Sequence, residues 1–202
     1  MGKLNEVIDE TWESFERVIS ATELFAEMAQ MRARSQFRQE DVGLLVMYAA
    51  EFARERARGE KRGVRVELSM EENVKGRRVP LEPRIFRRAL DEVLSNAVKY
   101  TPDGRAAHVR VWLEESWLAV ETRDEGIGVP ADKLEKVFDP FFSLEDFHQH
   151  VSSQYKFKGG GIGMGLTLAR LALESHGGTL KLESVEGQGT TVTMRLPLKA
   201  AV

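Results

Sequence analysis

Hydrophobic side chains recur at steps of three and four residues along the first part of the chain. The residues of this stripe are Leu4, Ile8, Trp12, Phe15, Ile19, Thr22, Phe25 and Met28. No Pro or Gly occurs between Lys3 and Gln39, so the pattern predicts one long amphipathic helix over about residues 4–34. Periodicity alone does not distinguish a helix packed on its own domain from one that forms a dimeric coiled coil or bundle.

Two more helices and a strand are predicted in the middle of the chain. Asp41 is a suitable N-cap for a helix that ends near Gly59, and Val64–Leu68 then alternates as a half-buried strand does. The pair Glu82-Pro83 opens a further helix that runs to about Lys99. Its predicted core-facing residues are Phe86, Leu90, Val93, Leu94 and Ala97.

The second half of the chain alternates between strands, one long polar segment and a helix. Four strands are predicted at 108–113, 117–123, 179–184 and 190–196, a helix at 166–175, and a loop or lid at about 142–165. Helices and antiparallel strands therefore interleave in an α+β pattern. We divide the chain into an N-terminal helix, residues 1–38, and one domain, residues 39–202.

Composition narrows the classes of function. The 202 residues are 42% hydrophobic and carry a formal charge of −3, so a sizeable core is expected but no positive field for nucleic acid or an anionic membrane. No apolar run approaches roughly 20 residues and the N-terminus lacks a signal-peptide core, so we expect a cytoplasmic chain without direct membrane contact. Because there is no cysteine, disulfides and thiolate chemistry are excluded.

Three polar residues of the 83–99 helix have the spacing of a single face. Glu92, Asn96 and Lys99 are separated by four and three positions, which stacks them along the helix. An amide oxygen suits Mg²⁺ and an ammonium suits phosphate, so the row could serve a magnesium-phosphate ligand. An ordinary exposed helix face with charged residues has the same spacing.

A carboxylate follows directly on the strand at 117–123. In Asp124-Glu125-Gly126-Ile127-Gly128, the two glycines let a flat ligand approach the backbone, and the Asp124 carboxylate can accept from an exocyclic amine. Such a site favours adenine, because the carbonyl of guanine would face the carboxylate acceptor to acceptor. A plain Asp-Gly turn is the alternative.

A glycine-rich segment, Gly159–Leu166, runs straight into the helix at 166–175. Free N–H groups at a helix N-terminus can face a polyphosphate, although a flexible hinge has the same composition. A Walker P-loop is excluded because Gly-Lys-Ser/Thr does not occur, and Tyr155–Lys158 is a poor strand for a Rossmann unit. Gly187–Thr191 between two strands reads on its own as a hairpin turn.

The ordered set of these segments, together with Phe138-Asp139-Pro140-Phe141-Phe142, closely resembles the catalytic ATP-binding domain of sensor histidine kinases. The five segments correspond in order to the family's N, G1, F, G2 and G3 boxes, and the resemblance covers about residues 40–198. It implies a two-layer α/β sandwich of the Bergerat type, with a mixed sheet covered by helices on one face.

The resemblance also implies roles for individual residues and two cofactors, ATP and Mg²⁺. Asn96 matches the magnesium-binding residue, Asp124 the carboxylate that reads adenine, and Thr191 a position near the adenine pocket. The remaining nucleotide-binding matches are Lys99, Tyr100, Gly126, Ile127, Gly128, Phe138, Gly161, Ile162, Gly163, Met164, Gly165 and Leu166.

Two departures from the family pattern stand out. Glu92 occupies a position where these kinases often carry Asn, and it is a candidate catalytic base or an orienting residue. The predicted lid has no Arg, so the family's cation over the phosphates would be Lys156 or Lys158, or absent.

The family transfers the γ-phosphoryl group to a histidine on an upstream helical hairpin. Here the first histidine is His108, on a predicted strand, so the acceptor would lie on a separate segment or subunit. The expected partners are that acceptor domain, a response regulator and a second copy joined through the N-terminal helix. A non-catalytic ATP sensor and a serine kinase resembling the anti-sigma factors are the alternatives.

Overall fold

The computed structural model describes residues 37–142 and 163–199, together with the isolated positions 19, 22 and 26. These three positions are helical, and the rest of the helix predicted over residues 4–34 lies outside the described residues. Its packing therefore stays a prediction. No helix in the described ranges has the length and apolar character that a bilayer span requires.

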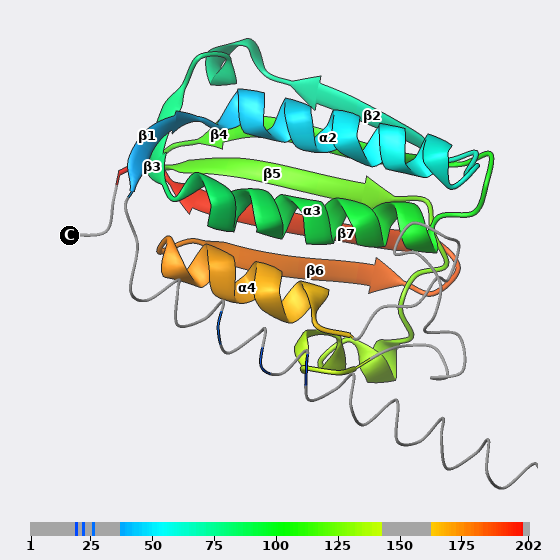
Figure 1. The fold of residues 1–202 in the computed structure, drawn as a ribbon. Helices are drawn as coiled ribbons and strands as arrows, with labels where there is room; N and C mark the ends of the chain where they lie inside the picture. Colours follow the sequence, from blue (N-terminus) through cyan, green and yellow to red (C-terminus); the bar gives the residue numbers. More distant parts are fainter. Residues whose placement is uncertain (1–18, 20–21, 23–25, 27–36, 143–162, 200–202) are drawn as a thin grey trace, which may run out of the picture.

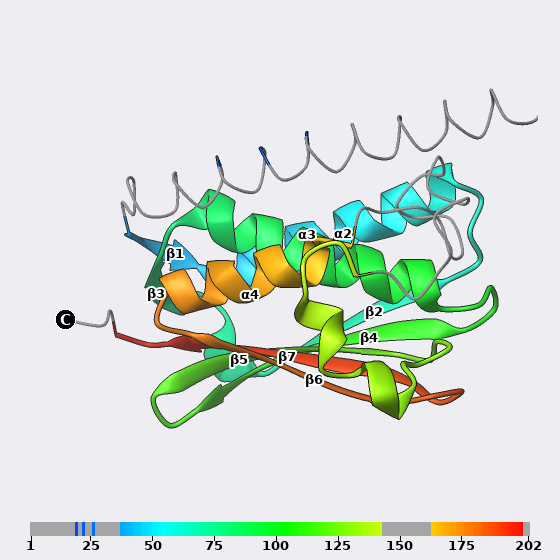
Figure 2. The ribbon, with the colours of Figure 1, turned by 90° about the horizontal axis from the view of Figure 1, so that it is seen from below.

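Two layers make up the domain: a five-stranded sheet, and helices that cover one of its faces (Figures 1 and 2). The sheet order is β2-β4-β5-β7-β6, with β2 parallel to β4 and every other pair antiparallel, so the sheet is mixed as predicted. The helices are α2 (Val42–Gly59), α3 (Pro83–Tyr100) and α4 (Gly165–Ser175), and the strands are β2 (Arg65–Met70), β4 (Ala106–Glu114), β5 (Trp117–Asp124), β6 (Thr179–Val185) and β7 (Gly189–Pro197).

The central helix α3 forms where capping and hydrophobic patterning agree. The Glu82 carboxylate accepts from the backbone N–H of Ile85 at 2.8 Å, and Pro83 supplies the fixed backbone angle of a first helical position. All five residues of its predicted stripe are buried between the sheet and the neighbouring helices. Burial of this face positions the polar row that begins at Glu92.

Helix α2 begins at its predicted cap, because Asp41 accepts from the backbone N–H of Leu44 at 3.1 Å. The side chain of Phe52, although aromatic, is exposed on this helix. The guanidinium groups of Arg56 and Arg87 lie 5.8 and 5.5 Å from the centre of its ring. Alanines at 49, 50, 53 and 57 make the core contact instead, which lets α2 pack closely on α3 and the sheet.

A second, two-stranded sheet was not predicted. It pairs β1 (Arg38–Asp41) antiparallel with β3 (Arg78–Leu81) and joins the starts of α2 and α3. Four polar residues in β1 and a proline in β3 give no strand signal. Three short 3-10 helices, η1 (Glu72–Val74), η2 (Ala131–Lys133) and η3 (Lys136–Phe138), complete the described elements.

His176 connects the end of α4 to the start of α3. Its Nε2 accepts from the backbone N–H of Glu82 at 3.0 Å, and its Nδ1–H donates to the carbonyl of Ala172 at 2.6 Å. Burial lowers the pKa of the imidazole. Both hydrogen bonds require a neutral ring that carries its proton on Nδ1, so His176 serves this buried junction as an uncharged side chain.

Arg62 fixes the other end of α3. Its guanidinium donates to the carbonyl of Thr101 at 2.6 Å and to that of Val98 at 3.3 Å, and its Nε contacts the Asp103 carboxylate at 2.8 Å. The hydrogen bond from Arg62 lowers the pKa of Asp103. These bonds satisfy carbonyl groups that the helix leaves open and hold the turn that leads into β4.

Candidate functional site

Asp124 is the last residue of β5, the central strand of the sheet, and its side chain points toward the helical layer. The side chain is 7% exposed, and its Oδ1 accepts from the backbone N–H groups of Gly126 at 2.9 Å and Thr190 at 3.1 Å. Within the described residues both bonds use Oδ1, so Oδ2 is the oxygen left for a ligand. Burial raises the pKa of Asp124 to about 6.

The two glycines that follow Asp124 are required by neighbouring backbone. A Cβ at Gly126 would lie 2.7 Å from the carbonyl oxygen of Tyr100, and one at Gly128, whose φ is +66°, would lie 2.1 Å from that of Val185. The N–H of Ile127 donates to the same Tyr100 carbonyl at 3.1 Å. The glycines thus let the turn wedge between the end of α3 and the β6–β7 connection, a reason that sequence alone did not provide.

The last motif reaches the site through Thr190. Besides its backbone bond to Asp124, its hydroxyl lies 2.9 Å from that of Ser184. Thr191 is opposite Arg123 and Glu183 in the sheet, so strand alternation directs its side chain to the other face. Thr190 is therefore the residue of this motif that contacts the carboxylate through its backbone, and a place for Thr191 near the adenine pocket stays a prediction.

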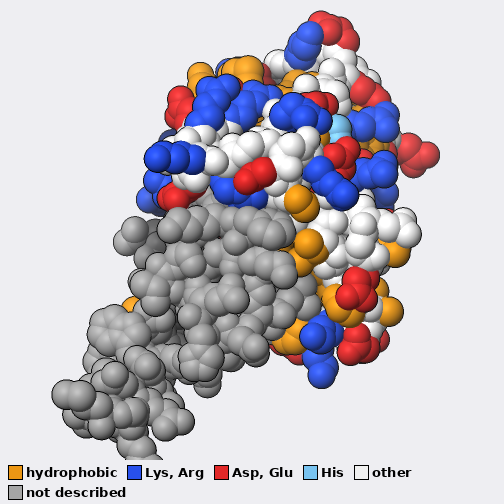
Figure 3. All heavy atoms as spheres, turned by 90° about the vertical axis from the view of Figure 1, so that its right-hand side faces the viewer, with side chains coloured by type: hydrophobic (Ala, Val, Ile, Leu, Met, Phe, Trp, Pro, Cys, Tyr) orange, Lys and Arg blue, Asp and Glu red, His pale blue; other side chains and the backbone are white. Residues whose placement is uncertain are grey.

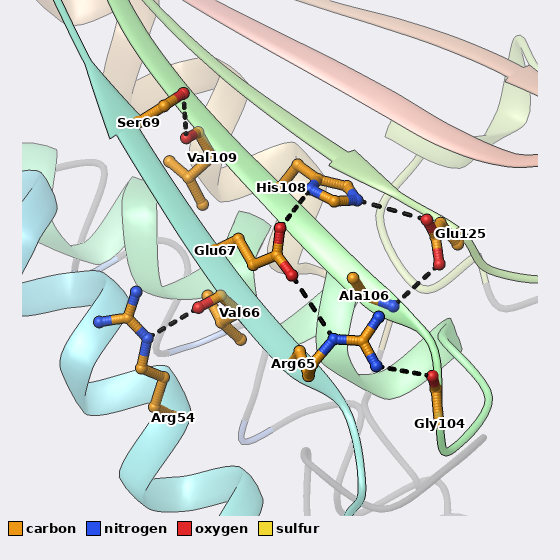
Figure 4. A network of polar contacts seen from close by, with 10 residues as sticks. All are labelled: Arg54, Arg65, Val66, Glu67, Ser69, Gly104, Ala106, His108, Val109 and Glu125. Carbon is orange, nitrogen blue, oxygen red and sulfur yellow. Dashed lines mark hydrogen bonds and ion pairs between the residues drawn. The ribbon is translucent and has the colours of Figure 1, made fainter.

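Glu125 secures the strand end next to Asp124 from the outer face of the sheet. Its carboxylate accepts from the backbone N–H of Ala106 at 3.0 Å and contacts His108 Nε2 at 3.3 Å, while His108 Nδ1 lies 3.2 Å from Glu67 (Figure 4). The bond from Ala106, with a smaller effect of His108, lowers the pKa of Glu125. His108 thus joins two carboxylates on β2 and the turn, as a structural contact.

The row on α3 is not an ordinary exposed face. The side chains of Glu92 and Lys99 are largely buried, with residue exposures of 7% and 6%, and Asn96 between them is half-buried. Glu92 forms an ion pair of 2.9 Å with Arg88, and the Lys99 ammonium lies 4.6 Å from the ring centre of Tyr100. The Glu92 end of the row faces the start of α4, and the helix end at Tyr100 meets the turn that follows Asp124.

Helix α4 begins against this row. A Cβ at Gly165 would lie 2.4 Å from Oε2 of Glu92, so the glycine brings the helix N-terminus onto the carboxylate. Gly163, with φ of +71°, approaches the backbone of Phe141 and Phe142 equally closely. Met164 is buried, and Leu166 is half-buried in the first turn.

Phe138 is held beneath α4. Its carbonyl accepts from the Thr167 hydroxyl at 2.8 Å, and the Arg170 guanidinium lies 5.0 Å from its ring centre. The segment that contains Phe138 therefore docks on α4 beside the glycine start. Four predicted ligand residues lie outside the described residues: Lys156, Lys158, Gly161 and Ile162.

The two ends of the site follow α3. One end, at Asp124, meets the helix at Tyr100, and the other end, at Gly165, meets it at Glu92. Eight residues of helix rise about 12 Å, and Asn96 lies midway. Figure 3 shows the molecule from the right-hand side of Figure 1. Many Lys and Arg side chains lie on this face, above the atoms drawn in grey.

This arrangement agrees with a match to known proteins. Residues 81–200 match the family described as histidine kinase-, DNA gyrase B- and HSP90-like ATPases. The chain belongs to this family. Within it, the curated relatives are histidine kinases, so the chain contains an ATP-binding catalytic domain of the sensor histidine kinase type.

Two of these relatives show how much of a larger protein is matched. The sensor histidine kinase WalK of Bacillus subtilis (strain 168) is 40% identical over 114 residues, which are 54% of this chain and 17% of that protein. The circadian input-output histidine kinase CikA of Synechococcus elongatus is 36% identical over 116 residues, 57% of this chain and 14% of that protein. The chain thus spans less than a fifth of the length of either relative.

Solved structures share its fold. The nucleotide-free catalytic domain of the histidine kinase ThkA aligns with a TM-score of 0.66 and 19% identity, and covers 81% of this chain and 97% of its own. Full-length ShkA in complex with AMPPNP aligns with a TM-score of 0.71 and 19% identity over 94% of this chain and 38% of that one. The predicted α+β sandwich is confirmed.

Proposed function

We propose that this histidine kinase-type domain binds MgATP along α3 and presents the γ-phosphoryl group to a histidine on another segment or subunit. The amino group of adenine would donate a hydrogen bond to Oδ2 of Asp124, and the triphosphate would reach the N-terminus of α4 at Gly165. The observation that carries the proposal is the spacing of these two ends, about 12 Å along α3, with Asn96 between them.

The residues present fit a magnesium ion that arrives with the nucleotide. No cluster of three or more His, Cys, Asp or Glu suited to a metal occurs in the described ranges. Mg²⁺ is commonly held by one or two protein oxygens and substrate phosphates, and the half-buried amide of Asn96 is one such oxygen. When bound, the ion offsets charge on the phosphate oxygens.

The domain itself forms no covalent bond during transfer of the phosphoryl group to histidine. An imidazole nitrogen forms the new bond to the γ-phosphorus, the bond from that phosphorus to the bridging oxygen breaks, and ADP leaves. The domain contributes by positioning, with Lys99 as a candidate phosphate ligand and Glu92 as the carboxylate of the row that can take the imidazole proton. Arg88, paired with Glu92, orients this carboxylate.

The acceptor is proposed to come from elsewhere because the described histidines serve the fold. His176 is buried between two backbone groups and His108 lies between two carboxylates. We also propose an acceptor domain and a downstream response regulator as partners, dimerisation through residues 1–38, and a cytoplasmic location. Lys156 and Lys158 are proposed as the lid cations.

Two experiments test the proposal. Calorimetry with ATP, ADP and AMPPNP, with and without Mg²⁺, is expected to show binding, and no heat with any of them would refute the site. Incubation with γ-labelled ATP and the helical hairpin domain of a related kinase is expected to give acid-labile, base-stable label. Acid-stable label would indicate a serine kinase, and binding without label an ATP sensor.

A further inference from the structure

Helix α2 carries an apolar stripe on its solvent-facing side. Four of its large hydrophobic side chains are between 40% and 58% exposed: Leu44, Met47, Tyr48 and Phe52. They are spaced by three, one and four residues, so they lie along one side of the helix. Among the residues that the structure describes, seven large hydrophobic side chains are exposed, and this α2 stripe holds four of them. Such a concentration on one helix face indicates a contact surface.

The α2 stripe is separate from the proposed nucleotide site. Helix α2 lies at one edge of the helical layer, and α3 stands between it and α4 (Figure 1). The opposite side of α2, which includes Val46, Ala49 and Ala53, is buried where the helix packs on α3 and β2. A partner on the stripe therefore lies on the other side of α3 from the start of α4.

The α2 stripe is symmetric about Tyr48. Leu44 lies four residues before Tyr48 and Phe52 lies four residues after it, about 6 Å in each direction along the helix axis. In an antiparallel pair of α2 helices with a twofold axis near Tyr48, Leu44 of one copy is level with Phe52 of the other. A contact between two identical chains requires this kind of self-complementary patch.

The charges along α2 favour the antiparallel pair. Asp41 caps the start of the helix and directly follows Glu40. The last turn carries Arg56 and Arg58. Asp41 lies seven residues before Tyr48 and Arg56 eight residues after it, so these opposite charges come level in an antiparallel pair. A parallel pair would place each charge beside its own copy and would align the two helix dipoles unfavourably.

The acidic residues on the exposed side of α2 agree with the same arrangement. Glu51 forms an ion pair of 2.8 Å with Arg54 of its own helix. Glu55 is exposed, and in the antiparallel pair it comes level with Val42 of the other copy, the first residue of that helix. Backbone N–H groups and the positive dipole end at a helix start attract a carboxylate.

We propose that the chain associates with a second copy through an antiparallel contact of the two α2 helices, centred on Tyr48. This contact is distinct from the dimerisation proposed for residues 1–38, and it does not depend on nucleotide binding. A single helix pair buries less area than a standard interface of about 1,600 Å², so the association is expected to be weak, with a dissociation constant in the micromolar range.

The test uses disulfide formation between copies of the full chain, which has no cysteine of its own. Tyr48→Cys is expected to form a disulfide-linked dimer under mild oxidation, because a residue near the twofold axis meets its own copy. Leu44→Cys and Phe52→Cys are each expected to form little dimer alone and several times more when the two variants are mixed. Arg110→Cys, exposed on the outer face of the sheet, is a control that is expected to link poorly in every mixture.

Sedimentation velocity of the full chain provides a second measurement. Tyr48→Glu places a charge at the centre of the stripe and is expected to weaken the concentration-dependent association by about tenfold or more. The melting temperature and the ATP affinity of this variant are expected to stay unchanged. Val185→Glu changes a similarly exposed apolar residue on β6 and is expected to associate as the wild-type chain does.

Each contrary result has a distinct meaning. If Tyr48→Cys links no better than Arg110→Cys, or Tyr48→Glu associates as strongly as the wild-type chain, the α2 contact is refuted. If Leu44→Cys and Phe52→Cys each link to themselves more than to each other, the pair is parallel and the proposed geometry is overturned. Because association and ATP binding are measured separately, failure of this inference is distinguished from failure of the proposed function.

Discussion

The carboxylate of Asp124 accepts a hydrogen bond of 3.1 Å from the backbone N–H of Thr190, a residue 66 positions later in the chain. The N–H of Gly126 donates to the same oxygen at 2.9 Å. Two distant glycine motifs are thereby joined at one buried acid. The arrangement fixes Oδ1 and orients Oδ2, at the cost of burying a charge, which raises the pKa of Asp124 to about 6.

The Asp124→Asn substitution is expected to weaken ATP binding while it raises the stability of the ligand-free domain. Asn keeps Oδ1 for both backbone donors but presents an NH₂ group to the adenine amine, so ATP binding is expected to weaken by about 1–3 kcal/mol. Without ligand at pH 8 the variant is expected to be more stable by about 1–3 kcal/mol, because no buried charge forms. Calorimetry and chemical denaturation measure the two effects, and unchanged ATP affinity would refute the adenine assignment.

Binding of the base is expected to depend on pH through Asp124. Its folded-state pKa is raised above the ordinary 3.8, so its contribution to stability is full below about 4 and is lost as the pH rises through about 6. Ligand affinity has the opposite sense, because the amine prefers the ionised acid. Adenosine, which lacks titrating phosphates, is expected to bind progressively weaker as the pH falls below 6, and Asp124→Asn is expected to abolish this dependence.

Alanine substitutions at two glycines of one turn are expected to reduce the stability of the fold by different amounts. Gly187 and Gly189 both have positive φ, 78° and 105°, but a Cβ at Gly189 would lie 2.0 Å from the carbonyl oxygen of Asp124, whereas at Gly187 nothing lies within 4 Å. Gly187→Ala is expected to cost about 1–2 kcal/mol from backbone strain. Gly189→Ala is expected to cost more and to weaken ATP binding. Equal losses in denaturant titrations would contradict this geometry.

Folding stability is expected to depend on pH through His176 as well, without an effect on ligand binding. Burial lowers its folded-state pKa below 6.5, so its contribution is full above 6.5 and is lost as the pH falls through the folded-state value. His176→Phe suits the neighbouring rings of Phe37 and Phe86 but leaves the N–H of Glu82 unpaired, a loss of about 1–3 kcal/mol at pH 8. The loss relative to wild type is expected to shrink toward pH 5, and a constant difference would contradict the prediction.

Asn96 is expected to control the metal dependence of nucleotide binding. Asn96→Ala removes the amide oxygen that the resemblance assigns to Mg²⁺, so the gain in ATP affinity on adding Mg²⁺ is expected to vanish while affinity without metal is kept. Asp91→Ala, which breaks a surface ion pair with Arg87 on the same helix, is a matched control that keeps the Mg²⁺ effect. Persistent metal dependence in Asn96→Ala would refute the assignment.

The described helices and the main sheet were largely predictable, because capping and hydrophobic alternation depend on residues close together in the sequence. Capping at Asp41 and Glu82 and alternation along β5 are short-range effects that the sequence displays. The ordered motifs likewise indicated the ATPase class.

Other features depend on contacts between residues far apart in the chain. The choice of Thr190 over Thr191 follows from strand register, the need for Gly128 from the carbonyl of Val185, and the neutral state of His176 from burial against Glu82. Gly128 and Val185, like His176 and Glu82, lie far apart in the sequence. The sequence by itself determined the main helices and strands and the chemistry they carry. Tertiary packing decided the small sheet of β1 and β3 and which atoms face the site, because burial and direction are set by the assembled layers.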